Sequence, residues 1–176
     1  AITVVDVYRY VVGHYAKQQT ETLRAMPSSS EAKKFKATHF DYCTFSGLFR
    51  RRNEKELLQH SGLMCLDFDH VGNPDTLKEQ LLKHEYFDTE LMFTSPSGDG
   101  VKWIIPIELK GWEHARLFKA VANCIKSTGL PPVDNSGSDV ARSCFLPYDP
   151  QAYINPKYED YVNENLFRPR MGECPF

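Results

Sequence analysis

The sequence lacks the features that mark several large classes of protein. Its five cysteines are odd in number and include no C-x-x-C pair, which argues against a disulfide framework and a zinc knuckle. No apolar run approaches the roughly 18 residues that a membrane span needs, and no signal peptide is visible at the start. These absences predict a protein of the reducing cytoplasm that does not enter a membrane.

A strong excess of either charge is also missing. The chain has 21 Lys and Arg residues against 23 Asp and Glu residues, a net charge of −2. The net charge therefore gives no indication of a nucleic-acid partner, although a single cleft can be basic on an acidic protein. Internal repeats and low-complexity tracts are absent as well. With 176 residues, the chain is long enough for one domain with a real core.

The predicted elements indicate an α+β fold in one domain spanning residues 1–176. Residues 1–60 are expected to be mainly helical, because apolar side chains recur there at three- and four-residue steps. Residues 61–150 hold the strongest strand patterns and form the expected core, which would bind metal and nucleotide. Residues 151–176 are rich in Tyr, Asn, Pro and Glu and are expected to form a surface tail or linker.

Three segments of that core have clear secondary-structure patterns. Residues 63–69 read as a central strand, and residues 91–107 read as a hairpin whose turn is rich in Ser and Gly. Residues 112–127 have the helical apolar pattern and are expected to pack across one face of the sheet. We therefore expect a mostly antiparallel sheet flanked by helices, with Lys102 of the hairpin near Asp67 of the strand.

The central strand ends in Asp67 and Asp69, two carboxylates separated by one residue. Such positions project from the same face of a strand, where two unpaired carboxylates repel each other. The pattern favours a hard divalent ion, Mg²⁺ or Mn²⁺, held between them for work on a phosphate. Because the two repel without an ion, neutralising Asp67 should leave the stability unchanged or raise it. The alternative is a strand that ends in solvent.

The hairpin turn is a candidate phosphate site, because Ser95, Ser97 and Gly98 offer hydroxyl and backbone donors and Lys102 offers a positive charge. It is not a Walker loop, since Lys102 does not follow a glycine and no helix begins there. An ordinary Asp-Gly turn followed by an exposed lysine is the simpler interpretation.

Two further segments could contribute charges. Asp134 could complete a three-carboxylate metal site and Arg142 could clamp a triphosphate, although acidic residues in such turns also serve as caps. Arg50, Arg51 and Arg52 follow aromatic residues and could grip a phosphate backbone, or could form a solvated edge.

The order of these motifs resembles the archaeo-eukaryotic primase superfamily, which carries D-x-D/E, S-x-H and hydrophobic-Asp motifs on a sheet related to RNA-recognition folds. The segments 45–47, 61–69, 95–102 and 139–150 are similar, more closely still, to the VirE-type N-terminal domain, typically fused to helicase-like ATPases of bacterial mobile elements. The resemblance covers roughly residues 33–156. It implies that Asp67, Asp69 and Asp134 hold metal ions, and that Ser97, Gly98 and Lys102 touch the incoming triphosphate, with Arg142 beside it.

The first functional hypothesis is therefore a primase-polymerase-like domain. It would bind a divalent metal and a nucleoside triphosphate at the three aspartates and act on single-stranded nucleic acid in the DNA replication of mobile elements. The question of enzyme activity stays open, because Lys102 stands where the primases have a histidine. The alternative is a catalytically inactive nucleic-acid-binding module attached to a helicase-like ATPase domain or chain. A distant alternative is a haloacid-dehalogenase-like phosphatase, whose nucleophile motif Asp67-x-Asp69 partly fits.

Overall fold

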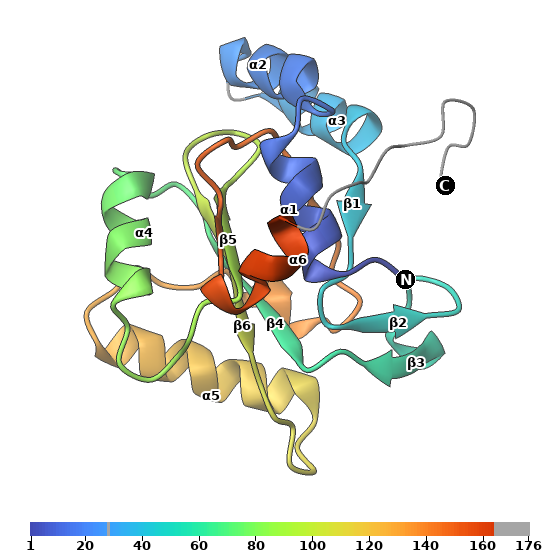
Figure 1. Cartoon of the computed structure of the whole chain (residues 1–176), viewed down its shortest axis with the longest axis vertical. Coiled ribbons are helices and arrows are strands. Elements are labelled where there is room, and N and C mark those ends of the chain that lie inside the picture. The colour runs from blue at the N-terminus through green and yellow to red at the C-terminus, as the bar shows by residue number, and fades with distance from the viewer. Residues whose placement is uncertain (28, 164–176) are drawn as a thin grey trace.

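The computed structural model describes residues 1–27 and 29–163 (Figure 1). Its first part contains three helices, α1 (Val4–Val12), α2 (Lys17–Ala25) and α3 (Ser30–His39). The sequence sets two of their starts. Thr3 and Asp6 form a reciprocal capping box at α1, and the Ser29 hydroxyl accepts the backbone N–H of Ala32 at α3. The helical pattern expected at the start of the chain is confirmed up to residue 39.

The centre of the fold is a four-stranded sheet in the order β4–β6–β5–β8. Its strands are β4 (Leu63–Phe68), β5 (Leu91–Thr94), β6 (Val101–Pro106) and β8 (Tyr153–Ile154), and every neighbouring pair is antiparallel. The predicted hairpin β5–β6 beside β4 is confirmed, as is the α+β class with an antiparallel sheet flanked by helices. The phosphatase alternative is wrong, because it requires the parallel sheet of regular βαβ units.

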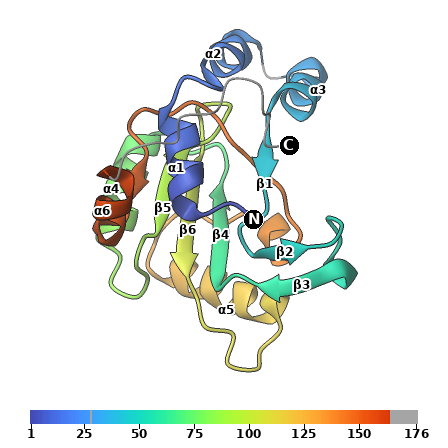
Figure 2. The same ribbon diagram turned by 45° about the vertical axis from the view of Figure 1, so that its right-hand side comes forward.

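Alternation along the strands divides the sheet into two buried faces. On one face, Met64, Leu66 and Trp103 pack against α4 (Pro74–Leu82) and α5 (His114–Ser127). Full burial of each such large side chain contributes roughly 1.5–3 kcal/mol. The opposite face packs against α1, which lies in front of the sheet in Figure 2. The expected packing of residues 112–127 across one face is confirmed.

Asp67 and Lys102 belong to the face that α1 covers. They alternate with Leu66 and Trp103, which point toward α5, and so project in the opposite direction. This alternation places two charged side chains among apolar neighbours, the position from which the candidate site is built.

Two small antiparallel sheets border this face. β1 (Tyr42–Cys43) pairs with β7 (Cys144–Phe145), and β2 (Gly47–Phe49) pairs with β3 (Leu57–His60) across a loop that contains the 3₁₀ turn η1 (Glu54–Glu56). Residues 42–60 are thus mostly strands and loops, and the helical part of residues 1–60 ends at His39 apart from the short turn η1.

The expected tail from residue 151 is, up to residue 163, part of the folded domain. β8 pairs with β5 and is followed by the 3₁₀ turn η3 (Pro156–Tyr158) and by α6 (Glu159–Asn163). The Tyr158 hydroxyl donates to the buried Glu90 carboxylate at 2.7 Å, and Lys157 pairs with the same carboxylate. The rest of the expected tail lies outside the described residues. No helix among residues 1–27 and 29–163 is long and apolar enough to cross a membrane.

Candidate nucleotide and metal site

Asp67 and Lys102 stand directly opposite each other on β4 and β6 and form an ion pair. Their side chains are only 16% and 12% exposed. Burial lowers the pKa of Lys102, but the neighbouring Cys144 and Asp67 outweigh it and raise that pKa to about 12. The lysine is therefore charged at neutral pH and holds one oxygen of the Asp67 carboxylate.

This pair contradicts the expectation that neutralising Asp67 leaves the stability unchanged. The expectation considered only the repulsion between Asp67 and Asp69, because nothing in the sequence specifies the register of β4 against β6. With Lys102 as partner, removal of the Asp67 charge would leave a buried cation without compensation, which destabilises a protein.

The three predicted aspartates lie in one neighbourhood. Burial raises the pKa of Asp67; Lys102 opposes this shift, and the charges of Asp69 and Asp134 add to it. The backbone N–H of Asp134 donates to the carbonyl oxygen of Asp67 at 2.8 Å, so the two residues are adjacent. Asp69 follows the end of β4 and is exposed. The predicted convergence of β4 with the segment around Asp134 is therefore present.

Asp134 begins the 3₁₀ turn η2 (Asn135–Ser138) and caps it, since its carboxylate accepts the backbone N–H of Ser136 at 2.6 Å. Hydrogen bonds from Ser136 lower the pKa of Asp134; burial opposes them, and the charges of Arg142 and Lys102 reinforce them. Asp134 is thus ionised and serves as the turn cap that the simpler interpretation expected.

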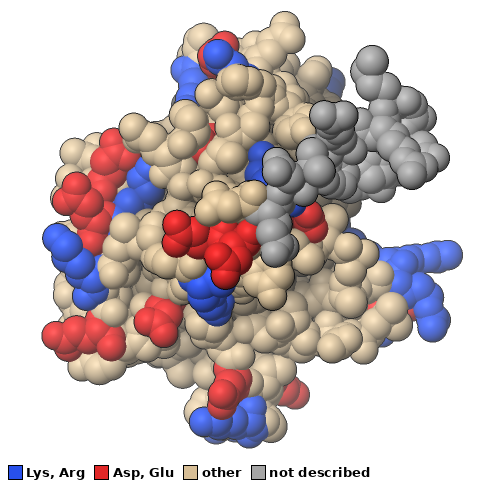
Figure 3. All heavy atoms as spheres, viewed as in Figure 1, with Lys and Arg blue, Asp and Glu red and all other residues tan. Residues whose placement is uncertain are grey.

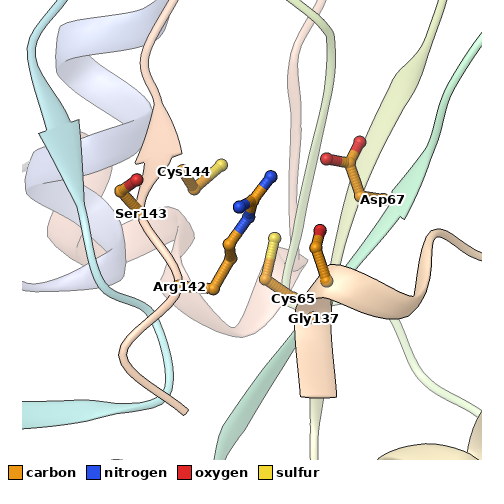
Figure 4. A pocket seen from close by; sticks show the side chains of 7 residues that line it. Cys65, Asp67, Gly137, Arg142, Ser143 and Cys144 are labelled. Atoms are coloured by element: carbon orange, nitrogen blue, oxygen red, sulfur yellow. The ribbon is translucent and has the colours of Figure 1, made fainter. Parts of the chain in front are cut away.

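A pocket opens between the sheet and the segment that follows η2 (Figure 4). Arg142 and Asp67 point toward each other across it. One buried polar atom in its lining, Asp67 Oδ1, has no hydrogen-bond partner among the described residues. The pocket is lined by Cys65, Asp67, Ser136, Gly137, Arg142, Ser143 and Cys144. A guanidinium and serine hydroxyls suit an anionic ligand, and the free carboxylate oxygen suits a cation or a donor.

Gly137 lets η2 lie directly on the sheet. A Cβ atom there would come within 2.5 Å of Phe118 Cε2 and 3.0 Å of the Cys65 carbonyl oxygen. The missing side chain therefore fixes how closely η2, and with it Asp134 and Ser136, approaches Asp67.

The three carboxylates do not form a ready-made metal centre. Within the part of the chain that the structure describes, no group of three or more His, Cys, Asp or Glu side chains is placed to hold a metal ion. Lys102 takes one oxygen of Asp67 and the turn η2 takes one oxygen of Asp134. Any ion at this place needs further oxygen ligands from a bound molecule.

The hairpin turn lies at the same end of the sheet but does not line the pocket. Ser95 is buried, and Arg24 of α2 donates to its carbonyl oxygen at 3.2 Å. Gly98 has a φ of +85°, a conformation that favours glycine, and its α-carbon faces the Arg24 side chain. Ser97 is exposed. Of the residues predicted to touch a triphosphate, only Lys102 and Arg142 therefore lie at the Asp67 site.

Arg50, Arg51 and Arg52 occupy the exposed loop of the β2–β3 hairpin. Figure 3 shows Lys and Arg side chains gathered at this end of the molecule. Arg50 pairs loosely with Glu56 at 3.9 Å, and the Arg52 guanidinium lies over the Tyr42 ring at 5.7 Å. The three arginines are separate from the pocket and form a surface of their own.

The sequence analysis missed five pocket residues: Cys65, Ser136, Gly137, Ser143 and Cys144. Ser136 carried a weak signal, because it stands in a short polar turn after a predicted metal ligand. His70 was missed as well; its Nδ1 lies 2.6 Å from Asp99 Oδ2 and ties the end of β4 to the hairpin turn. The histidine directly follows Asp69, which is a signal that could have been used.

Two hydrogen-bonded histidines contact Gly137, which lines the pocket. The Gly62 N–H donates to His60 Nδ1 at 3.0 Å, His60 Nε2 lies 3.1 Å from His114 Nδ1, and His114 Nε2 lies 3.1 Å from the Gly137 carbonyl oxygen. All three contacts are satisfied when both rings are neutral and each Nε2 carries the proton. Burial lowers the pKa of both histidines; their mutual repulsion adds to this for His60, whereas Gly137 and Asp139 oppose it for His114.

We expect these two histidines to make the stability of the protein sensitive to acid. A lowered pKa of a histidine in the folded state means that its stabilisation is present above the ordinary value of 6.5 and is lost as the pH falls through the lowered value. Urea unfolding at a series of pH values measures the free energy of unfolding. As the pH falls, this free energy should decrease less steeply for His60→Gln than for the wild type. His39→Gln, on exposed α3, is the control. An equally steep decrease in His60→Gln would contradict the neutral state of the two rings; His84, whose pKa burial also lowers, contributes equally to all three proteins.

Comparison with known proteins gives one match to a family. The model of the family described as "BT4734-like, N-terminal domain" matches residues 34–154. No curated protein matches the chain. Among solved structures, the polymerase domain from Mycobacterium tuberculosis ligase D in complex with DNA shows a likeness at 16% identity and a TM-score of 0.34. The matched region covers 50% of this chain and 39% of that chain, and a likeness of this size does not establish a common fold.

Proposed function

We propose that this chain, which belongs to the BT4734-like N-terminal domain family, is a primase-polymerase-like domain of the VirE type. In this proposal it binds a nucleoside triphosphate together with Mg²⁺ or Mn²⁺ and acts on single-stranded nucleic acid. Its further context would be the DNA replication of mobile elements, with a helicase-like ATPase domain or chain as partner. The order of motifs in the sequence is the basis for this context.

The observation that carries the proposal is the pocket between Asp67 and Arg142. It combines an arginine, two serine hydroxyls and a carboxylate oxygen that has no partner in the described residues. A buried polar atom without a partner costs stability, about 1–3 kcal/mol. Such atoms are best explained when a polar ligand completes their hydrogen bonds, and a triphosphate offers both the acceptors and the charge.

Each residue then has a defined task. Arg142 would hold phosphate oxygens through its planar guanidinium, and Ser136 would donate its hydroxyl proton to one of them. Lys102 contributes a positive charge beside the pocket and fixes the direction of the Asp67 carboxylate. Gly137 keeps η2 close enough to the sheet for Ser136 and Asp67 to face the same ligand.

The residues fit a divalent ion in chemistry but do not complete its ligand set. Asp67, Asp69 and Asp134 are hard oxygen donors that suit Mg²⁺ or Mn²⁺, and Asp67 Oδ1 is free. When bound, such an ion would neutralise phosphate charge and polarise the reacting phosphoryl group. Because Lys102 and η2 occupy other carboxylate oxygens, we propose that ion and triphosphate bind together, each weak without the other.

Calorimetric titration tests the pocket directly. A non-hydrolysable nucleoside triphosphate should bind in the presence of Mn²⁺, and Arg142→Ala should weaken it by about 1–3 kcal/mol, the value of a charge-assisted contact. Arg116→Ala, an exposed arginine on α5, is the matched control. Binding to inorganic phosphate as tight as to triphosphate, or equal affinities for wild type and Arg142→Ala, would contradict the proposal.

The second candidate function is a nucleic-acid-binding module without catalysis. The observation that favours it is the Asp67–Lys102 pair, because the ammonium group holds an oxygen that a catalytic metal ion would use. Primer extension on a single-stranded template, with Mn²⁺ and nucleoside triphosphates, separates the two. Extension that Asp67→Asn abolishes supports the enzyme; nucleic-acid binding without extension or triphosphate binding supports the module.

A further inference from the structure

The outer face of the β1–β7 pair carries aromatic rings and cations in alternation. Tyr42 and Phe145 are direct cross-strand partners, with ring centroids 6.0 Å apart at an interplanar angle of 76°. The Arg52 guanidinium lies 5.7 Å from the centroid of Tyr42, and Lys36 Nζ lies 6.0 Å from that of Phe145. We call these four residues the β1–β7 strip.

The strip and the pocket occupy opposite faces of the same two strands. Cys43 and Cys144, the other cross-strand pair, point inward, and Cys144 lines the pocket. Phe145 follows Arg142 by three residues, so one short segment supplies the pocket's cation and one ring of the strip. The strip and the pocket are therefore joined through this segment.

Tyr42 is held as a platform and is open to solvent. Its side chain is 51% exposed, although the ring touches Phe145 edge-on and is thereby fixed in direction. An exposed aromatic ring with a cation over its face offers stacking to a flat π system, and nucleobases are the commonest such groups.

The charges around the strip fit a phosphate backbone. Arg50 and Arg51 continue the cationic surface from Arg52 along the β2–β3 loop, and Lys36 lies at the other end. Of the nearby acidic side chains, Asp41 accepts the Tyr10 hydroxyl at 2.7 Å, and Glu56 pairs loosely with Arg50 at 3.9 Å; Arg51 and Arg52 have no ion pair among the described residues. On a chain with a net charge of −2, this local excess of cations is a specific feature.

We propose that single-stranded nucleic acid binds along the β1–β7 strip, with a base stacked on Tyr42 and its phosphates on Arg50, Arg51, Arg52 and Lys36. The proposal deepens the proposed function, because it names the surface that guides a strand to the pocket. Binding to the strip itself needs neither metal nor triphosphate. Phe145 acts as a positioning residue that keeps the Tyr42 ring in place.

Fluorescence anisotropy with a labelled oligothymidylate tests the strip, since this strand forms no secondary structure of its own. Tyr42→Ala should weaken binding by about 5- to 150-fold, the effect typical of one lost stacked base. Tyr42→Phe should bind as the wild type does. Arg52→Ala should weaken binding and reduce the slope of log affinity against log salt by about one. Tyr86→Ala and Lys110→Ala, exposed residues elsewhere, are the matched controls.

Three results would overturn the proposal. Equal affinities for Tyr42→Ala and Tyr86→Ala would exclude stacking, and a duplex that binds more tightly than the single strand would exclude a single-strand surface. Competition by polyglutamate as effective as by oligothymidylate would show a site for acidic protein segments instead. Triphosphate titrations on the same variants separate the two proposals, because Tyr42→Ala should leave triphosphate affinity unchanged while Arg142→Ala should lower it.

Discussion

Replacing Lys102 by methionine should lower the free energy of unfolding by about 3–5 kcal/mol at neutral pH, because the substitution leaves the buried Asp67 carboxylate without its partner. Methionine fills a similar volume, so the lost charge dominates the effect. Urea unfolding measures the change. The loss should be larger at pH 7 than at pH 4, since a carboxyl whose pKa is raised in the folded state costs stability only where it is ionised.

Two comparisons make this prediction specific. The double variant Asp67→Asn/Lys102→Met should recover much of the stability, because it removes both charges. Lys110→Met breaks an ion pair with Glu108 whose side chains are 77% and 78% exposed, and it should cost well under about 1 kcal/mol. A Lys102→Met protein as stable as the wild type would show that the two side chains are not paired in solution.

The same variant bears on the metal. With Lys102 gone, Mn²⁺ alone should stabilise Lys102→Met more than it stabilises the wild type, because the ion can then use both Asp67 oxygens. If Mn²⁺ stabilises both proteins equally, Asp67 is not its ligand, and the proposed site is wrong in its central residue.

Asp149→Ala is the second substitution with a large expected effect, again about 3–5 kcal/mol. The Asp149 carboxylate accepts the backbone N–H of Thr94 at 2.7 Å and that of Gln151 at 3.0 Å, and lies 3.8 Å from Lys78 Nζ. The side chains of Asp149 and Lys78 are 8% and 11% exposed. Alanine would leave the Thr94 N–H without its acceptor and would leave Lys78 with only the exposed Asp75 as an ionic partner.

Asp75→Ala is the control for this prediction. Asp75 lies closer to Lys78 Nζ, at 3.1 Å, but is 76% exposed, and its loss should cost less than about 1 kcal/mol. Equal losses in urea unfolding for Asp75→Ala and Asp149→Ala would show that the nearer, exposed carboxylate is the true partner of Lys78.

The elements that could be predicted from sequence are those with local signals. Asn73 and Pro74 begin α4 as cap and first residue, and the Ser- and Gly-rich turn specifies the β5–β6 hairpin. β3, β8 and the pairing of β1 with β7 could not be predicted, because short strands show no period and their partners are distant in sequence. Tertiary contacts decide these pairings.

The candidate site, too, could be predicted from the sequence only in part. The resemblance places Asp134 beside Asp67, and the structure brings their backbones into contact. The three carboxylates form no metal-binding group within the described residues. Lys102 is expected near Asp67, and the structure confirms it. The direct ion pair could not be predicted, because it depends on the pairing register of β4 and β6. Ser136 and Cys144 could not be predicted either, since their place in the pocket depends on how η2 and β7 return to the sheet.

The β1–β7 pair also determines when the site can form during synthesis. It joins Tyr42 to Phe145, so it must wait until nearly the whole described chain has left the ribosome, whereas the β2–β3 and β5–β6 hairpins close over short loops. The side of the pocket that contains Arg142 is therefore among the last parts of the fold to form. Until then the face of β4 that carries Cys65 and Asp67 lacks the cover of β7 and η2, and exposed surface of this kind favours aggregation of a nascent chain.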